Sequence, residues 1–278
     1  MTHHPEVLDA VRRALDEDIG AGDVTSRICV PANRRARGRF LAREPLVLAG
    51  TALLPLIYEL RGGIDKLQTH NRDGDELKDG DILAEVEGRA RTLLECERVS
   101  LNFLQRLSGV ATLARHFANQ VAGTNCKVLD TRKTTPGLRR LEKAASAAGG
   151  ATNHRMGLFD AVLIKNNHIA AAGGVREALE NAQREAPDLP IEIEIRSRAE
   201  LDEALSAGAR HLLLDNLTPQ EARAWIEAIA GRATTEISGG VTLETVRAYA
   251  ETGADFVSAG AITHSARAMD LSFRLELE

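Results

Sequence analysis

The feature that most restricts the fold is a repeat of short apolar segments in the second half of the chain. After residue 125, runs of aliphatic residues alternate with segments of helical periodicity, and the last four runs recur about every 20 residues. Units of this length favour parallel strands joined by right-handed crossovers. The predicted strands are Lys127–Leu129, Ala161–Ile164, Ile191–Ile195, His211–Leu214, Thr234–Ile237 and Asp255–Ser258. They indicate an α/β barrel, incomplete at six strands, with a flat doubly wound sheet as the alternative.

The first part of the chain has a different pattern and reads as α+β. Residues 6–19 have one apolar helical face, and residues 93–121 form a longer helical pattern that contains Gly109. Arg37–Leu41 and Leu46–Ala49 are short apolar runs between turn signals and are predicted strands. Glycine weakens a helix by about 1 kcal/mol relative to alanine, so Gly109 suggests a close packing contact or a ligand.

Two threonine–proline pairs predict helix starts in the second half of the chain. Thr135-Pro136 and Thr218-Pro219 each offer a side-chain N-cap followed by proline in the first turn. Gly149 is a candidate helix end.

The composition excludes several classes of protein. The net charge is −5, which argues against a nucleic-acid partner. The longest apolar stretch, Leu46 to Tyr58, contains Gly50 and Pro55 and is shorter than the roughly 18 residues of a membrane helix. Three widely spaced cysteines and the absence of an apolar leader favour a reducing, cytoplasmic setting.

Cations gather where the first two predicted strands end, the edge at which α/β barrels carry their active sites. Between residues 127 and 165 the chain has eight basic residues and three acidic ones. Guanidinium and ammonium groups in such a cluster can bind carboxylates or phosphates. The candidates are Arg132, Lys133 and Lys165, with Arg139, His154 and Arg155 in adjoining segments.

The later strand ends carry carboxylates and small residues. Glu194 and Asp215 offer oxygen ligands for Mg²⁺ or for sugar hydroxyls. Alternation places Glu192 on the same strand face as Glu194, either as a site residue or as a buried structural partner. Small residues after the last two strands let backbone N–H groups approach a phosphate; they are Ser238, Gly239, Gly240, Ser258, Ala259 and Gly260.

In these segments the chain resembles the quinolinate phosphoribosyltransferase family. The most specific matches are DTRKTTPGLR at 130–139 and GGATNHRMGLFDAVLIKNNHI at 149–169. Further matches lie at 16–26, 97–112, 211–216, 236–240 and 257–270, so they span nearly the whole chain. One departure is Asn166, where the family usually has an acid; it removes a negative charge beside Lys165.

The resemblance implies a fold and a reaction. The fold is an N-terminal α/β sandwich domain, residues 1–107, followed by an incomplete α/β (TIM-like) barrel, residues 108–264, with the tail 265–278 packing back on the first domain. The reaction joins quinolinate to phosphoribosyl pyrophosphate and releases nicotinate mononucleotide, pyrophosphate and CO₂, with Mg²⁺ as cofactor. This is a step of NAD biosynthesis.

The resemblance also implies roles for the candidate residues. The base-binding group would be Arg98, Thr131, Arg132, Lys133, His154, Arg155 and Lys165. Arg98 would reach the site of a neighbouring subunit, which implies a homodimer or a homohexamer. Glu194 and Asp215 would serve the ribose and the metal, and the residues at 238–240 and 258–260 would hold the phosphate. The catalytic set would be Lys133, Lys165, Glu194 and Asp215.

Three other interpretations remain open from the residues alone. A relative could use another base, such as nicotinate, or be a paralogue linked to metal transport. Lys133 or Lys165 could form a Schiff base in a barrel aldolase. A non-catalytic anion-binding module is the third, although buried carboxylates would not help it.

Overall fold

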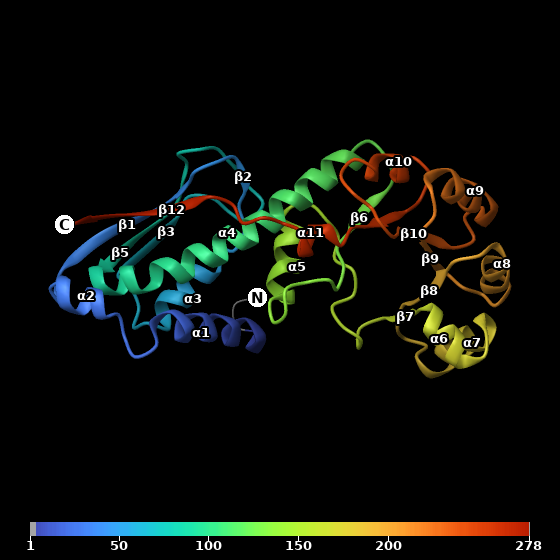
Figure 1. Cartoon of the computed structure of the whole chain (residues 1–278), viewed down its shortest axis with the longest axis horizontal. Helices are drawn as coiled ribbons and strands as arrows, with labels where there is room; N and C mark the ends of the chain where they lie inside the picture. The colour runs from blue at the N-terminus through green and yellow to red at the C-terminus, as the bar shows by residue number, and fades with distance from the viewer. Residues whose placement is uncertain (1–3, 278) are drawn as a thin grey trace. The chain divides into compact units, whose positions relative to one another are not determined.

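The computed structural model describes residues 4–277 and divides them into two units (Figure 1). The first unit comprises the chain up to Arg115, Thr134–Gly150 and the chain from Ser265 onward. The second comprises His116–Lys133 and Ala151–His264. The single domain boundary predicted after residue 107 stays a prediction. The two units of the structure instead place Thr134–Gly150 with the first part of the chain.

The first unit is an antiparallel sheet with helices. Its four-stranded sheet has the order β12-β1-β5-β3. Its elements are α1 (Pro5–Ile19), α2 (Val24–Cys29), β1 (Arg35–Ala42), β2 (Leu46–Val47), α3 (Leu53–Glu59), β3 (Lys66–Thr69), β4 (Glu76–Leu77), β5 (Ile82–Arg89), most of α4 (Ala90–Val121), α5 (Arg139–Ala148) and β12 (Leu271–Leu277). The two long predicted helices are therefore confirmed as α1 and α4.

The end of the chain completes this sheet. β12 pairs antiparallel with β1, and the rings of Phe40 and Phe273 meet with centroids 4.8 Å apart. Before β12, the backbone runs along α4, where Met269 N–H donates to the carbonyl of Gln105 at 3.0 Å. A Cβ on Gly109 would lie 1.9 Å from the carbonyl oxygen of Arg267. Gly109 is thus explained by close backbone packing within the first unit.

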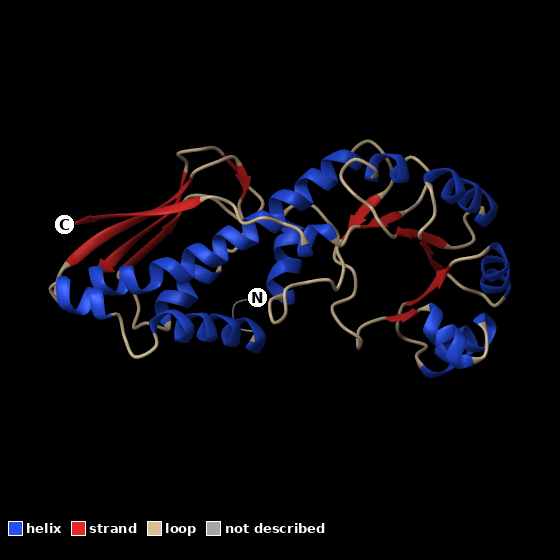
Figure 2. Cartoon of the chain, in the orientation of Figure 1, coloured by secondary structure: helices blue, strands red, loops and turns tan. Residues whose placement is uncertain are grey.

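The second unit contains a six-stranded parallel sheet. Its order is β6-β11-β10-β9-β8-β7, and the strands follow a curved path with helices outside them (Figure 2). Its elements are β6 (Lys127–Leu129), β7 (Val162–Ile164), α6 (Asn166–Ala172), α7 (Val175–Glu185), β8 (Ile191–Ile195), α8 (Arg198–Ser206), β9 (His211–Asp215), α9 (Pro219–Ile229), β10 (Thr234–Ser238), α10 (Val246–Ala250), β11 (Phe256–Ser258) and α11 (Ala261–His264). The predicted incomplete barrel is confirmed.

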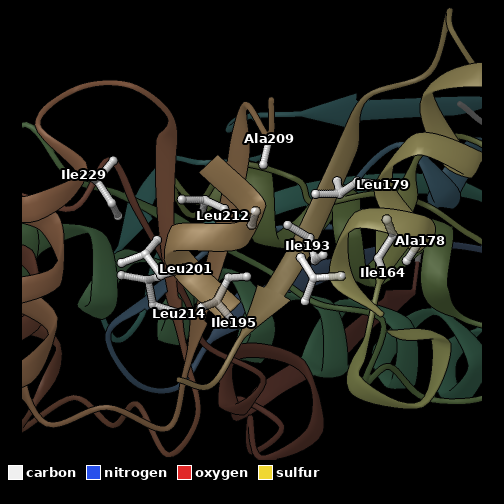
Figure 3. Packing of buried hydrophobic residues seen from close by; sticks show 12 residues of the cluster. Ile164, Ala178, Leu179, Ile193, Ile195, Leu201, Ala209, Leu212, Leu214 and Ile229 are labelled. Atoms are coloured by element: carbon white, nitrogen blue, oxygen red, sulfur yellow. The ribbon is translucent and has the colours of Figure 1, made fainter. Parts of the chain in front are cut away.

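The two faces of each strand have different roles. Ile193 and Ile195 of β8 pack with Leu212 and Leu214 of β9 against the helices of the unit (Figure 3). Because neighbouring residues of a strand point to opposite faces, Glu192 and Glu194 lie on the other, inner face. The predicted alternation along this strand is therefore correct.

One predicted helix start is wrong and the other is confirmed. α5 begins at Arg139, after a turn in which Gly137 has φ +79°. Thr135 does not cap the helix, because its N–H and hydroxyl donate to Glu142 at 2.9 and 2.6 Å. α9 begins as predicted. The Thr218 hydroxyl caps it by accepting the Glu221 backbone N–H, and the Glu221 carboxylate accepts the Thr218 backbone N–H. α5 also ends at Gly149, as predicted.

Within residues 4–277, no helix combines the length and the apolar character that crossing a membrane requires.

Candidate functional site

Parallel pairing brings most of the predicted site residues to one edge of the second unit. The six strands run in the same direction, so their carboxyl ends share this edge. The strand register shows which strand ends are neighbours. Ser238 pairs with Asp215, and Ser258 pairs with Leu129, which lies just before the basic residues at 132 and 133. The residues at or just after these ends are Thr131, Arg132, Lys133, Lys165, Glu194, Asp215, Ser238, Gly239, Gly240, Ser258, Ala259 and Gly260.

Arg98 is placed differently. It is exposed on α4 and belongs to the first unit, whereas the other predicted site residues except Arg139 belong to the second. Arg139 also belongs to the first unit, where its Nε donates to Thr134 Oγ1 at 3.0 Å.

The loop after β6 holds Lys133 against the last strand end. A Cβ on Gly260 would lie 2.9 Å from Cδ of Lys133, so glycine lets this side chain pack closely against the turn. The Thr263 hydroxyl donates to the Lys133 carbonyl at 2.8 Å, and the Lys133 N–H donates to the Thr131 hydroxyl at 3.1 Å. These contacts join the predicted base-binding loop to the predicted phosphate turn.

Arg155 lies close enough to Arg132 for their positive charges to repel each other. Burial and the positive charge of Arg132 lower the pKa of Arg155, while Asp160 and Glu192 act in the opposite direction. Arg155 is also held by its Nη1, which donates to the Ala161 carbonyl at 3.1 Å. Two neighbouring guanidinium groups are well suited to an anion with more than one negative charge.

Lys165 follows β7 directly and precedes α6. Its side chain is exposed, and its backbone N–H donates to Nδ1 of His168 at 2.9 Å. Asn166 is the first residue of α6 and is also exposed. The effect of Asn166 on Lys165 stays a prediction from charge alone.

The two predicted acids share one cation. Nη2 of Arg196 lies 2.6 Å from Oε1 of Glu194 and 3.1 Å from Oδ2 of Asp215. The carboxylates are nearly buried, with 6% and 12% of their side chains exposed, whereas Arg196 is 46% exposed. A single positive group held between two carboxylates shows that this position suits a cation.

The turn after β9 fits closely against the turn after β10. Asn216 has φ +58°, and its side-chain amide donates to Oδ2 of Asp215 at 2.8 Å. A Cβ on Gly239 would lie 2.2 Å from Oδ1 of Asn216, and Gly239 itself has φ +100°. The glycine at this position is therefore required by the neighbouring turn, independently of any phosphate.

His154 lies on the inner side of the barrel between two glutamates. Its Nε2 is 3.2 Å from Oε2 of Glu192 and 3.3 Å from Oε2 of Glu236. Glu236 is the third residue of β10, and the Asp130 carboxylate accepts the His154 backbone N–H at 2.9 Å. Sequence reasoning placed His154 with the cations of the rim and did not connect it with Glu236.

These neighbours decide the charge of His154. Burial alone would lower its pKa, but the hydrogen bonds and charges of Glu192 and Glu236 outweigh burial and raise the pKa to about 9. The Arg155 N–H also points to Nδ1 at 2.7 Å, a contact that favours a neutral ring. Nε2 carries one hydrogen in either form of the ring, so the negative charges of Glu192 and Glu236 decide the balance, and we assign the imidazolium form at neutral pH. Burial and Glu236 raise the pKa of Glu192, since two close carboxylates resist double ionisation.

A cavity of about 380 Å³ adjoins this cluster. His154 and Arg155 line it, together with Ile191, His211 and Thr234 at the amino ends of their strands. Among the described residues, His154, Glu192 and Glu236 also place ligand atoms within 4.8 Å of one another, as a metal site would require. A proton on His154 serves the same purpose of neutralising the carboxylates.

Arg196 and Glu236 are the residues that strand-end reasoning missed. Arg196 immediately follows β8, the position at which Lys165 follows β7, so the same rule would have found it. Glu236 shares the inner face of β10 with Ser238, two residues further on. Its pairing with His154 depends on the curvature of the sheet, and no pattern in the neighbouring sequence predicts it.

The chain matches two family models over most of its length. Residues 23–108 match the N-terminal domain of quinolinate phosphoribosyl transferase, and residues 110–274 match its C-terminal domain. The chain is 41% identical to a probable nicotinate-nucleotide pyrophosphorylase (carboxylating) of Bacillus subtilis, covering 99% of this chain and 95% of that one. It is 41% identical to the nicotinate-nucleotide pyrophosphorylase (carboxylating) of Mycobacterium leprae, with 96% of each covered. The crystal structure of NadC from Streptococcus pyogenes superposes with a TM-score of 0.93 at 38% identity, covering 97% of this chain and 96% of that one.

Proposed function

The chain belongs to the quinolinate phosphoribosyltransferase family, and we propose that its barrel edge carries out the reaction of that family. The chain transfers a phosphoribosyl group from phosphoribosyl pyrophosphate to quinolinate, with loss of CO₂, in NAD biosynthesis. The observation that carries the assignment of the site is the meeting of basic, acidic and glycine-containing strand ends at one edge of the sheet.

The basic group would bind the pyridine dicarboxylate. Quinolinate has two adjacent carboxylates, and Arg132 and Arg155 offer neighbouring guanidinium groups for them. Lys133, Lys165 and the hydroxyl of Thr131 lie at the same edge, and His154 adds an inner cation. Arg98, which lies in the other unit, would act in the site of a neighbouring subunit.

The acidic pair would serve the ribose and a Mg²⁺ ion. Glu194 and Asp215 fit such an ion because their oxygens already share one cationic group and are shielded from water. When bound, Mg²⁺ would supply positive charge for the departing pyrophosphate. The carboxylates themselves would stabilise positive charge that develops on the ribose.

The small residues after β10 and β11 would hold phosphate oxygens. Gly240 has φ +62° and no heavy atom within 4 Å of an added Cβ, so its backbone borders open space. Backbone N–H groups in such turns can bind an anion. The proposed cradle comprises Ser238, Gly239, Gly240, Ser258, Ala259 and Gly260.

The reaction then needs no covalent enzyme intermediate. The bond from the ribose anomeric carbon to pyrophosphate breaks, and the pyrophosphate keeps the electron pair. The pyridine nitrogen, oriented through its carboxylates, forms the new bond to that carbon. The ring is now a pyridinium, and its positive nitrogen stabilises the electrons left on the adjacent carbon when that carboxylate leaves as CO₂. A proton then takes the place of the CO₂.

The test is release of CO₂ from quinolinate by the full chain. We expect release only when phosphoribosyl pyrophosphate and Mg²⁺ are both present. Arg132→Ala should reduce kcat/KM for quinolinate by at least about tenfold, since a charge-assisted contact contributes about 1.5–3 kcal/mol. Arg184→Ala is the control, since Arg184 is an exposed surface residue of α7.

Three results would change the assignment. Turnover of nicotinate in place of quinolinate would indicate a relative with another base. A borohydride-trapped adduct with a carbonyl substrate would indicate Schiff-base chemistry at Lys133 or Lys165. Unchanged kinetics in Arg132→Ala would remove Arg132 from the base site.

We also propose a homodimer or a homohexamer in the cytoplasm. The exposed position of Arg98 outside the barrel unit supports a role across subunits. Sedimentation analysis of the full chain tests the assembly, and fractionation of source cells tests the location.

A further inference from the structure

Arg196 occupies the position that the proposed function gives to a divalent cation. Its Nη2 contacts Oε1 of Glu194 and Oδ2 of Asp215, at 2.6 and 3.1 Å. Asp215 and Glu194 come from adjacent strands of the parallel sheet, and both are shielded from water. Close carboxylates in such a setting repel one another, so a cation between them stabilises the pair.

A guanidinium and a metal ion cannot both use these oxygens. A divalent cation binds carboxylate oxygens at about 2.0–2.6 Å, which would place it directly beside the guanidinium, a group of like charge. Arg196 can leave without breaking the fold, because it follows the end of β8 and its side chain is 46% exposed. The Asp215 carboxylate also accepts a hydrogen bond from the Asn216 side-chain amide, a neutral donor.

We propose that Arg196 is a built-in counter-ion that must release Glu194 and Asp215 before they engage a divalent cation, and that it thereby sets the metal concentration the enzyme requires. This inference rests on the proposed role of the two carboxylates. Arg196 acts through them and is a positioning residue. It compensates the charge of the two carboxylates and makes metal binding depend on an exchange of cations.

The first experiment measures metal binding without substrates. Mn²⁺ binding to the full chain is followed by electron paramagnetic resonance for the wild type and Arg196→Gln. We expect Arg196→Gln to bind Mn²⁺ at least about tenfold more tightly, since removing a charge-assisted pair frees two carboxylates for the metal. Arg196→Lys, which keeps the positive charge, should stay near the wild type.

Two controls locate the effect. Arg198→Gln removes a neighbouring exposed arginine, whose Nε lies 3.3 Å from Asp202 one helical turn away, and should leave Mn²⁺ affinity unchanged. In the double variant Arg196→Gln/Asp215→Asn, the gain in affinity should disappear, because the freed site has lost one of its ligands. Thermal unfolding of each variant identifies any that fails to fold, and Arg196→Lys provides a milder change at the same position.

The outcomes separate this inference from the proposed function. An Mn²⁺ affinity of Arg196→Gln equal to or weaker than that of the wild type would overturn the counter-ion role, as would a gain that survives Asp215→Asn. CO₂ release from quinolinate by the wild type would still support the proposed function in that case. If the inference holds, the Mg²⁺ concentration that half-saturates CO₂ release should also be lower in Arg196→Gln.

Discussion

His154 shows how neighbouring side chains can change what one residue does. As a lone histidine it would be mostly neutral at pH 7, with an ordinary pKa near 6.5. Between Glu192 and Glu236 it becomes a cation, because two carboxylates compensate the cost of burying its charge. The same contacts give the inner face of the barrel a fixed positive group beside Arg155, at the wall of the cavity.

The His154 cluster predicts a pH dependence of folding. Its pKa of about 9 in the folded chain exceeds the ordinary value, so the folded chain holds a proton that the unfolded chain releases. The stabilisation is complete below about pH 6.5, decreases as pH rises, and is lost above about pH 9. The free energy of unfolding of the wild type should therefore exceed that of His154→Gln by about 2–3 kcal/mol more at pH 6 than at pH 10.

Urea unfolding at several pH values measures this difference. His116→Gln, at an exposed position on α4, is the matched control and should not change the pH dependence. A constant difference between wild type and His154→Gln from pH 6 to pH 10 would show that the glutamates do not hold the proton.

At the scale of elements, α4 and the backbone that runs along it explain an unfavourable residue. Helix propensity alone would favour alanine at position 109. The carbonyl of Arg267 lies where the alanine methyl group would be, and the same stretch leads into β12, which pairs with β1. Packing of the chain end therefore overrides the local preference of the helix.

Gly109→Ala should destabilise the fold by about 1–3 kcal/mol despite its higher helix propensity, because it forces the chain end away from α4. The free energy of unfolding measures the effect. Asn119→Ala, at an exposed position of the same helix, should be neutral or slightly stabilising. Equal stability of Gly109→Ala and the wild type would contradict the close backbone contact.

At the scale of the whole molecule, the proposed site takes its parts from segments far apart in the chain. The barrel unit supplies the strand-end residues, while Arg98 lies on α4 in the other unit. In a symmetric assembly each subunit could supply Arg98 to its neighbour and receive the same residue in return.

Mixing two inactive variants tests this arrangement. Arg98→Ala and Asp215→Asn should each lose most of the CO₂-releasing activity. After the two are unfolded and refolded together, heterodimers should contain one intact site, and the mixture should recover about a quarter of wild-type activity. A mixture no more active than the separate variants would mean that Arg98 acts within its own chain, or not in the site.

Short-range patterns in the sequence determined the parallel strands, the alternation that puts Glu192 with Glu194, and the residues at each strand end. These features depend on neighbours along the chain, so periodicity and turn chemistry reveal them. Only the tertiary structure decided that Arg196 bridges Glu194 and Asp215, that Glu236 meets His154, and that Thr135 binds Glu142 instead of capping α5. Which partner a charged group finds depends on strand order, sheet curvature and burial, because these set the distance and the shielding between groups that local sequence does not relate.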